Sequence, residues 1–171
     1  MKRILSVVCC MALCSIPALA KEKTMTKPPM SDQKFVDFAA QTDMVEANLG
    51  QLAQSASSSQ PVKDCAQTLV TNHTADFHQL YSAAQEAKLT VPDAIDAENN
   101  KTMIGPFEKL KGEAFDHRYV EDLVAGHTKA IEIYKKEAAD ADNPALKSYA
   151  EAALHVLEKH LDKAKALEKD K

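Results

Sequence analysis

The sequence predicts an all-α protein, a ferritin-like four-helix bundle with a long connection between its second and third helices. Four stretches repeat apolar residues at three- and four-residue spacing, which is typical of amphipathic helices. No stretch shows the sustained alternation with β-branched residues that indicates a strand. The connections between the four stretches are short, long and short, and one long connection favours the ferritin-like order over a simple up-and-down bundle.

The first twenty residues are expected to be a signal peptide and not part of the fold. Lys2 and Arg3 precede the apolar run "ILSVVCCMALCSIP", which is too short to span a bilayer comfortably. Ala18, Leu19 and Ala20 form a small-residue cleavage site. This pattern predicts cleavage after Ala20 and a periplasmic or secreted protein.

Three of the four cysteines lie in this leader: Cys9, Cys10 and Cys14. A lipid-modified cysteine usually follows a small residue, whereas a bulky residue or another cysteine precedes each of these, so cleavage is favoured over lipidation. Only Cys65 remains afterwards, so no intramolecular disulfide can form in the oxidising compartment. Cys65 shares a helical stripe with Val62 and Leu69 and is expected to be a small buried side chain.

The mature chain is long enough for one domain, a bundle over residues 32–169 that follows a flexible lead-in at residues 21–31. Loss of Lys2 and Arg3 from the 21 basic residues, against 25 acidic ones, leaves a net charge of about −6. An acidic chain without a basic cluster argues against nucleic acid as a partner. No other segment approaches membrane-spanning length.

The first two predicted helices form one hairpin. Ser31 caps a helix that begins at Asp32 and continues to about residue 58, with Phe35, Leu49 and related residues on its apolar face. The segment "SSSQP" ends this helix. Pro61 suits the first turn of the second helix, which runs to about residue 88.

The long connection covers residues 89–112 and is expected to be mainly irregular, with a short helix around Phe107 and Leu110. The third helix is expected over residues 113–140, and Pro144 opens the fourth after Asn143 as its cap. Helices of this size are about 40 Å long. A 24-residue connection can cross that length at about 3.3 Å per residue, so the second and third helices are predicted to run parallel.

Four polar residues interrupt the apolar faces, one on each helix: Glu46, His73, His127 and His160. Each lies about 18–24 Å along its helix, near the middle. They therefore stay within a turn or two of each other whichever way the helices point. The sequence repeats Leu-Val-x-x-His-Thr at "LVTNHT" and "LVAGHT", and parallel helices would bring His73 and His127 to the same depth.

One glutamate and three histidines in a bundle core form a candidate site for a transition metal, namely zinc, copper or iron. The alternative is three buried histidines that are hydrogen-bonded to polar neighbours without a metal. The Glu-x-x-His pattern of di-iron bundles is missing, because valines at positions 70 and 124 stand three residues before His73 and His127. Asp116 and Tyr119 are secondary candidates. Asp116 lies about 16 Å along the helix from His127, so it is expected to pair or cap locally.

The chain resembles a bacterial secreted family called "domain of unknown function 4142", whose members are ferritin-like bundles of the outer membrane or periplasm. The matching segments are "FVDFAAQTDMVEANLGQLA", "VKDCAQTLVTNHTADFHQL", "AFDHRYVEDLVAGHTKAIEIY" and "LKSYAEAALHVLEKHLDKAKAL". The resemblance implies an envelope location and carries over Glu46, His73, Asp116, Tyr119, His127 and His160 as site positions. The family often has an aspartate before each mid-helix histidine, where this chain has Asn72 and Gly126.

Two functions follow from these observations. The first is a periplasmic bundle that binds a metal ion for storage, sequestration or protection of the envelope. The second is a metal-free adaptor for an envelope protein that the sequence does not identify. An enzyme would need an open coordination position beside a cavity, which a sequence does not show. We find no spacing typical of hydrolases, nucleotide-binding loops or thiol-redox motifs.

Overall fold

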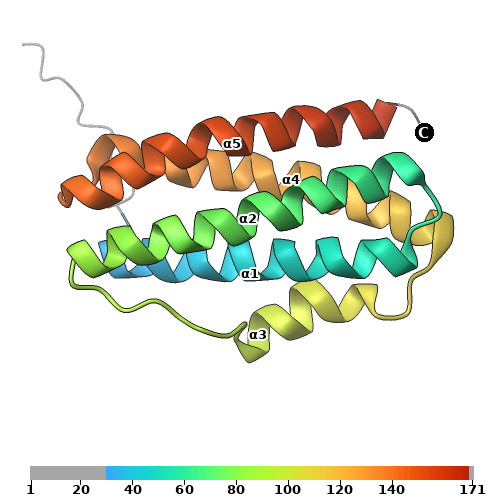
Figure 1. Ribbon diagram of the computed structural model, residues 1–171, viewed down its shortest axis with the longest axis horizontal. Coiled ribbons are helices and arrows are strands. Elements are labelled where there is room, and N and C mark those ends of the chain that lie inside the picture. The colour runs from blue at the N-terminus through green and yellow to red at the C-terminus, as the bar shows by residue number, and fades with distance from the viewer. Residues whose placement is uncertain (1–29, 170–171) are drawn as a thin grey trace, which may run out of the picture.

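The computed structural model describes residues 30–169 and contains four long helices (Figure 1). They are α1 (Asp32–Ala56), α2 (Gln60–Glu86), α4 (Gly112–Asp140) and α5 (Pro144–Lys169). No strand occurs within residues 30–169, which confirms the all-α prediction. The predicted signal peptide and nearly all of the predicted lead-in lie outside the described residues.

The connection between α2 and α4 holds a short helical segment. It consists of α3 (Ala97–Asn99), a π turn (Asn100–Ile104) and a 3-10 turn (Gly105–Phe107). The helical part therefore begins earlier than the predicted turn around Phe107 and Leu110. The Asp96 side chain explains this start, because it accepts a hydrogen bond from the backbone N–H of Asn99 at 2.7 Å.

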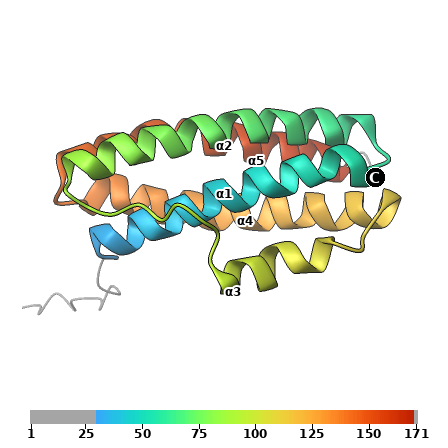
Figure 2. The ribbon, with the colours of Figure 1, turned by 60° about the horizontal axis from the view of Figure 1, so that its bottom comes forward.

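The chain forms two antiparallel hairpins, α1 with α2 and α4 with α5. Figures 1 and 2 show the connection leaving α2 at one end of the bundle, passing beneath α1 and α4, and entering α4 at the opposite end. Consequently α2 and α4 run in the same direction. The predicted ferritin-like order with one long crossover is confirmed.

Local sequence signals account for the short turns between the helices of each hairpin. The hydroxyl of Ser59 accepts a hydrogen bond from the N–H of Val62 at 3.4 Å, and Pro61 occupies the first turn of α2. The side chain of Asn143 accepts from the N–H of Ala145 at 2.9 Å at the start of α5. Both caps satisfy N–H groups that a helix cannot pair internally.

The core consists of two apolar clusters on either side of the bundle's middle. One contains Phe35, Leu80 and Tyr134 among its buried members, and the other contains Leu49, Phe115 and Leu123. Cys65 is buried in the second cluster, as predicted. The residues between the two clusters are polar. This polar layer is the part of the fold that positions the candidate site.

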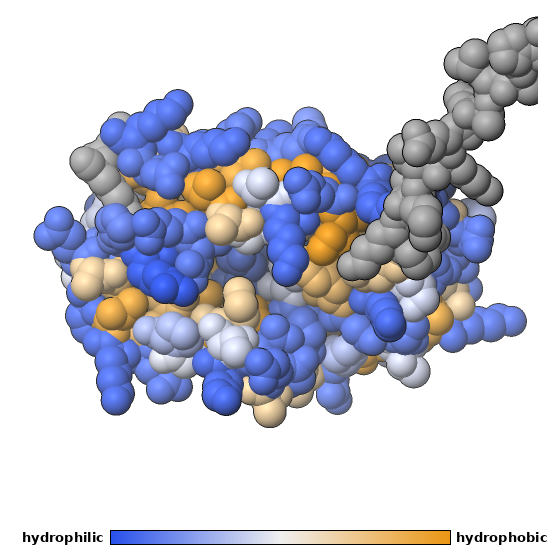
Figure 3. All heavy atoms as spheres, turned by 180° about the vertical axis from the view of Figure 1, so that it is seen from behind, coloured by the Kyte–Doolittle hydropathy of each residue, from blue (hydrophilic) through white to orange (hydrophobic). Residues whose placement is uncertain are grey.

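The described helices carry polar outer faces around this core. Figure 3 shows a largely hydrophilic surface broken by smaller apolar patches. None of the helices within residues 30–169 is long and apolar enough to cross a membrane.

Candidate metal centre

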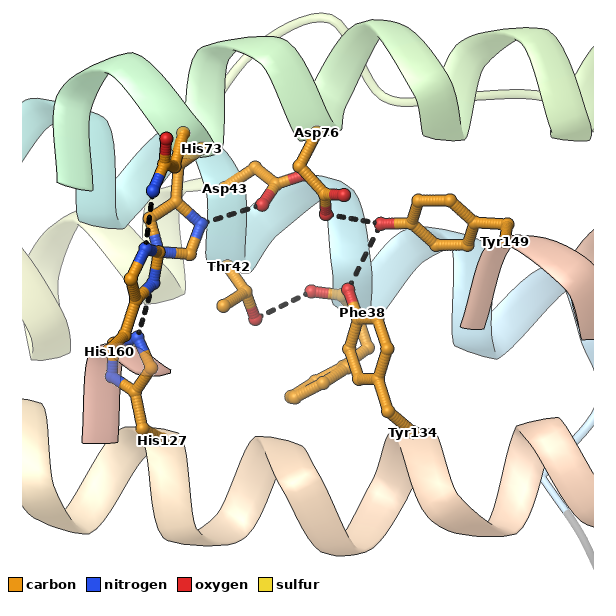
Figure 4. A network of polar contacts seen from close by, with 10 residues as sticks. Phe38, Thr42, Asp43, His73, Asp76, His127, Tyr134, Tyr149 and His160 are labelled. Carbon is orange, nitrogen blue, oxygen red and sulfur yellow. Dashed lines mark hydrogen bonds and ion pairs between the residues drawn. The ribbon is translucent and has the colours of Figure 1, made fainter. Parts of the chain in front are cut away.

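Three histidines from three helices meet in the polar layer (Figure 4). His73 comes from α2, His127 from α4 and His160 from α5, and each is only 2 % exposed. Each offers one ring nitrogen, and these three nitrogens lie within 4.8 Å of one another. The chain therefore brings together three of the four residues singled out from the sequence. His73 and His127 are at the same depth on parallel helices, with ring centroids 5.8 Å apart.

The imidazoles of His127 and His160 belong to one hydrogen-bonded chain. Nδ1 of His127 lies 3.0 Å from the carbonyl oxygen of Leu123, which can only accept, so this nitrogen carries the proton. Nε2 of His127 then accepts from Nδ1 of His160 at 3.3 Å. Nε2 of His160 accepts in turn from the side-chain amide of Asn72 at 2.9 Å. Two rings are thus satisfied in the absence of a metal.

His73 is held differently, by a carboxylate that the sequence analysis did not single out. Its Nδ1 lies 2.8 Å from Oδ1 of Asp43 on α1, and Asp43 is 2 % exposed. The Nε2 of His73 is buried and has no hydrogen-bond partner among the described residues. Asp43 fixes the proton on Nδ1, so the lone pair of Nε2 is free toward the other two rings.

A sequence signal for Asp43 existed. It stands four residues after Ala39 and seven after Val36, which are both fully buried, and so belongs to the core stripe of α1. The neighbouring stripe through Thr42, Val45 and Leu49 instead indicated Glu46 as the polar residue of the core face.

Glu46 lies beside this group but is not one of the three clustered residues. Its side chain is partly buried, and its Oε2 is buried without a hydrogen-bond partner within residues 30–169. Glu46 and His127 line the same pocket. Burial raises the pKa of Glu46, while nearby His73 acts in the opposite direction. Its expected role as a ligand stays a prediction.

The environment keeps the three imidazoles neutral. Burial lowers the pKa of His127 to about 4, and His73 contributes in the same direction. Burial and the two other histidines lower the pKa of His160 to about 3. The pKa of His73 is also lowered by burial, against the attraction of Glu46 and Asp76. Neutral imidazole is the form that binds a metal, so no ring has to lose a net proton first at neutral pH.

A second polar group lies on the other side of Asp43 (Figure 4). Burial and the charge of Asp76 raise the pKa of Asp43 well above its usual range. The hydroxyl of Tyr149 donates to Oδ2 of Asp76 at 2.6 Å and lies 3.1 Å from the hydroxyl of Tyr134. Buried Asp43, partly buried Asp76 and two buried tyrosines thus extend the polar layer behind His73.

The secondary candidates lie elsewhere. Asp116 accepts hydrogen bonds from the N–H and hydroxyl of Ser58 at 3.3 and 3.0 Å, which ties the start of α4 to the α1–α2 turn. Tyr119 stacks on Phe115 with ring centroids 5.4 Å apart, inside an apolar cluster. Neither belongs to the three-histidine group. The partner of Asp116 lies 58 residues away in the chain, so the contact is a tertiary one and not the local pairing or cap expected from the sequence.

The donor set fits a first-row transition ion. At metal–nitrogen distances of about 2.0–2.1 Å, neighbouring ligands of a tetrahedral ion are about 3.3–3.4 Å apart. Nε2 of His127 and Nδ1 of His160 are already 3.3 Å apart. The widest separation in the group is at most 4.8 Å, so small side-chain rotations would close it. The ring of His160 would have to move its proton from Nδ1 to Nε2.

The fold and site define a helical bundle with a buried layer of histidines and carboxylates. The chain belongs to the family described as "Domain of unknown function (DUF4142)", which matches residues 17–167. The solved structure titled "CopM in the Cu(II)-bound form" is similar, with a TM-score of 0.64 and 12 % sequence identity. The match covers 84 % of this chain and 99 % of that one, and at this identity it shows the shared fold alone. No curated protein matches the sequence.

Proposed function

We propose that this protein binds a divalent transition-metal ion through His73, His127 and His160. One observation carries the proposal: three neutral, buried imidazoles place their nitrogens within 4.8 Å in a polar layer between two apolar clusters. An unpartnered buried nitrogen costs free energy, and Nε2 of His73 has no hydrogen-bond partner within residues 30–169. A bound ion would give this nitrogen a partner.

The second support is the carboxylate behind the ligand. A metal-binding histidine commonly donates its other N–H to a carboxylate, which fixes the tautomer and makes the ring a stronger ligand. Asp43 has this relation to His73. The remaining support is comparative, since CopM, a solved structure of similar fold, is in a Cu(II)-bound form.

Copper(II) and zinc are the ions that the site suits best, because nitrogen ligands from imidazole match both. The buried centre and the predicted leader favour sequestration of the ion in the cell envelope, as storage or as protection against metal stress. The helices place each ligand on a different rigid element, which suits retention of the ion.

A metal titration with matched histidine variants tests this function. The chain has six histidines, and α2, α4 and α5 each carry one buried and one exposed member. We would titrate the tag-free protein with Cu²⁺ and Zn²⁺ by calorimetry, and compare His73→Leu, His127→Leu and His160→Leu with His78→Leu, His117→Leu and His155→Leu. Only the first three substitutions should abolish binding of one ion per chain. Equal effects in both sets, or no stoichiometric binding to the unmodified protein, would refute the proposal.

The second candidate function is a metal-free adaptor of the cell envelope. The satisfied chain from Leu123 through His127 and His160 to Asn72 favours it, because two rings need no ion to be stable. If the protein binds no metal, replacing the buried imidazole of His127 with leucine should leave the free energy of unfolding unchanged or raise it. The melting temperature of His127→Leu, measured with and without Cu²⁺, separates the two. A metal centre predicts that Cu²⁺ raises the melting temperature of the unmodified protein only.

A further inference from the structure

A pocket of about 360 Å³ lies between α1, α4 and the helical segment of the connection. Glu46 and His127 form part of its inner wall, and Asp37, Asp96 and Lys129 lie among its polar lining. At this pocket the polar layer reaches a cavity through Glu46 and His127. Three carboxylates against one lysine give the pocket a negative balance, which favours the entry of a cation.

The pocket is large enough for a hydrated ion. An ion with six waters needs about 180 Å³ for its hydration shell, at about 30 Å³ per water. The three histidines, by contrast, are buried and leave no room for such a shell. An ion that passes from the pocket to the histidines must therefore exchange water for protein ligands on the way.

Glu46 is positioned for that exchange. Its Oε2 is buried and unpartnered within the described chain, and the side chain lines the pocket together with His127. Gly126 on α4 lines the same pocket, and a Cβ at this position would lie 3.7 Å from Oε1 of Glu46. The missing side chain at this position leaves the space beside the carboxylate open.

We propose that this pocket is the route by which the ion enters and leaves the three-histidine centre, with Glu46 as the transfer ligand between pocket and His127. The inference rests on the proposed metal binding and adds its path. A carboxylate binds the incoming ion as it loses water, and then yields it to imidazoles that hold it more firmly. Glu46 thereby affects the rates of uptake and release more than the affinity.

The connection forms the outer wall of this route. The side chain of Gln41, which is 8 % exposed, donates to the carbonyl oxygen of Ala94 at 2.9 Å and accepts from the N–H of Asp96 at 2.9 Å. It also accepts from the amide of Asn99 at 3.3 Å. One side chain of α1 thus holds the segment against the bundle, so Gln41→Ala should loosen the wall and speed exchange.

Stopped-flow kinetics with Cu²⁺ test the route. The chain has no tryptophan and four tyrosines, so quenching of tyrosine fluorescence reports uptake, and excess EDTA then drives release. Two substitutions act on the path: Glu46→Gln removes the transfer charge and Gly126→Leu fills the space. Their matched controls are Glu151→Gln, at an exposed site on α5, and Ala125→Leu, at an exposed site next to Gly126 on α4. Circular dichroism verifies that each variant is folded.

We expect Glu46→Gln and Gly126→Leu to slow both uptake and release about tenfold, with the dissociation constant changed by less than about threefold. The two controls should match the unmodified protein. Unchanged rates of uptake and release in Glu46→Gln would overturn the route. Weaker binding caused by faster release alone would also overturn it, because Glu46 would then be a permanent ligand of the ion. If the unmodified protein takes up no stoichiometric ion, the proposed metal binding itself is wrong. If it binds the ion but Glu46→Gln leaves the rates unchanged, only the proposed route is wrong. Should Gly126→Leu not fold, Glu46→Gln decides.

Discussion

Asp43 and His73 form a buried carboxyl–imidazole contact in the part of the bundle that the structure describes. Oδ1 of Asp43 lies 2.8 Å from Nδ1 of His73, and the two side chains are only 2 % and 3 % exposed. The contact joins α1 to α2 in the polar layer between the two apolar clusters. It fixes the direction in which Nε2 of His73 points.

Replacement of this carboxylate should weaken metal binding without removing a ligand. Asp43→Asn keeps the shape of the side chain but replaces the carboxyl group with a neutral amide, which is a weaker acceptor for the Nδ1–H of His73. We expect the affinity for Cu²⁺ or Zn²⁺ to fall about 10–100-fold, as measured by calorimetry. Asp162→Asn, at an exposed position on α5, is the control for net charge. An affinity that stays level in Asp43→Asn would contradict the assigned contact.

Asn72 controls the proton on His160. Its amide donates to Nε2 of His160, which keeps the proton on Nδ1, the nitrogen that faces His127. Asn72→Asp offers only an acceptor, so it should move the proton to Nε2 and free Nδ1 for the ion. We expect binding about tenfold tighter by calorimetry. Asn72→Leu, which can orient neither tautomer, serves for comparison and should not tighten binding.

Glu137 makes the stability of the bundle depend on pH. This residue of α4 is 5 % exposed, and burial together with Asp32 and Asp140 raises its pKa to about 7. Between pH 4.5 and about 7 the folded state therefore holds more protons than the unfolded state, so stability falls as the pH rises through this window.

Glu137→Gln should remove that dependence. We expect it to raise the free energy of unfolding by up to about 3 kcal/mol at pH 8 and to change it little at pH 4. Urea unfolding at the two pH values measures the difference. The exposed Glu132→Gln on the same helix is the control. An equal gain at both pH values would show that the pKa of Glu137 is not the cause.

Gly50 allows the close crossing of α1 and α2. A Cβ at this position would meet Cγ2 of Val70 at 2.7 Å and the carbonyl oxygen of Ala66 at 2.9 Å. The backbone of α2 cannot move aside as a flexible side chain can. Gly50→Ala should therefore lower the free energy of unfolding by about 1–2 kcal/mol, even though alanine is the better helix former.

Thermal unfolding of Gly50→Ala and Gly105→Ala checks this point. A Cβ at Gly105 would approach only the carbonyl oxygen of Asn100, at an ordinary 3.6 Å, so this control should melt at the unmodified temperature or slightly above. Equal melting temperatures of the two variants would contradict the close crossing.

Much of the fold was predictable because local physics governs it. The spacing of apolar residues predicted the four long helices to within a few residues, and Pro61 and Asn143 marked two of their starts. The length of the 89–112 segment predicted the crossover, since only a long connection can reach the opposite end of the bundle. The short helix in this segment was misplaced because its start depends on the cap that Asp96 provides.

The depth of each candidate ligand was also predictable, but the direction of its side chain was not. Depth follows from the number of residues at about 1.5 Å each, whereas direction depends on how each helix is rotated about its own axis. Asp43 and Glu46 illustrate this difference. They lie one turn apart and about 60° apart around α1, so either one could face the histidines.

By itself, the sequence determined the helices, their order and the mid-bundle position of His73, His127 and His160. The tertiary structure alone decided that Asp43 contacts His73, that Asn72 contacts His160 and that Glu46 faces the pocket. The physical reason is the packing of the two apolar clusters. Their side chains lock the rotation of all four helices at once, and this rotation selects which polar groups meet in the layer between them.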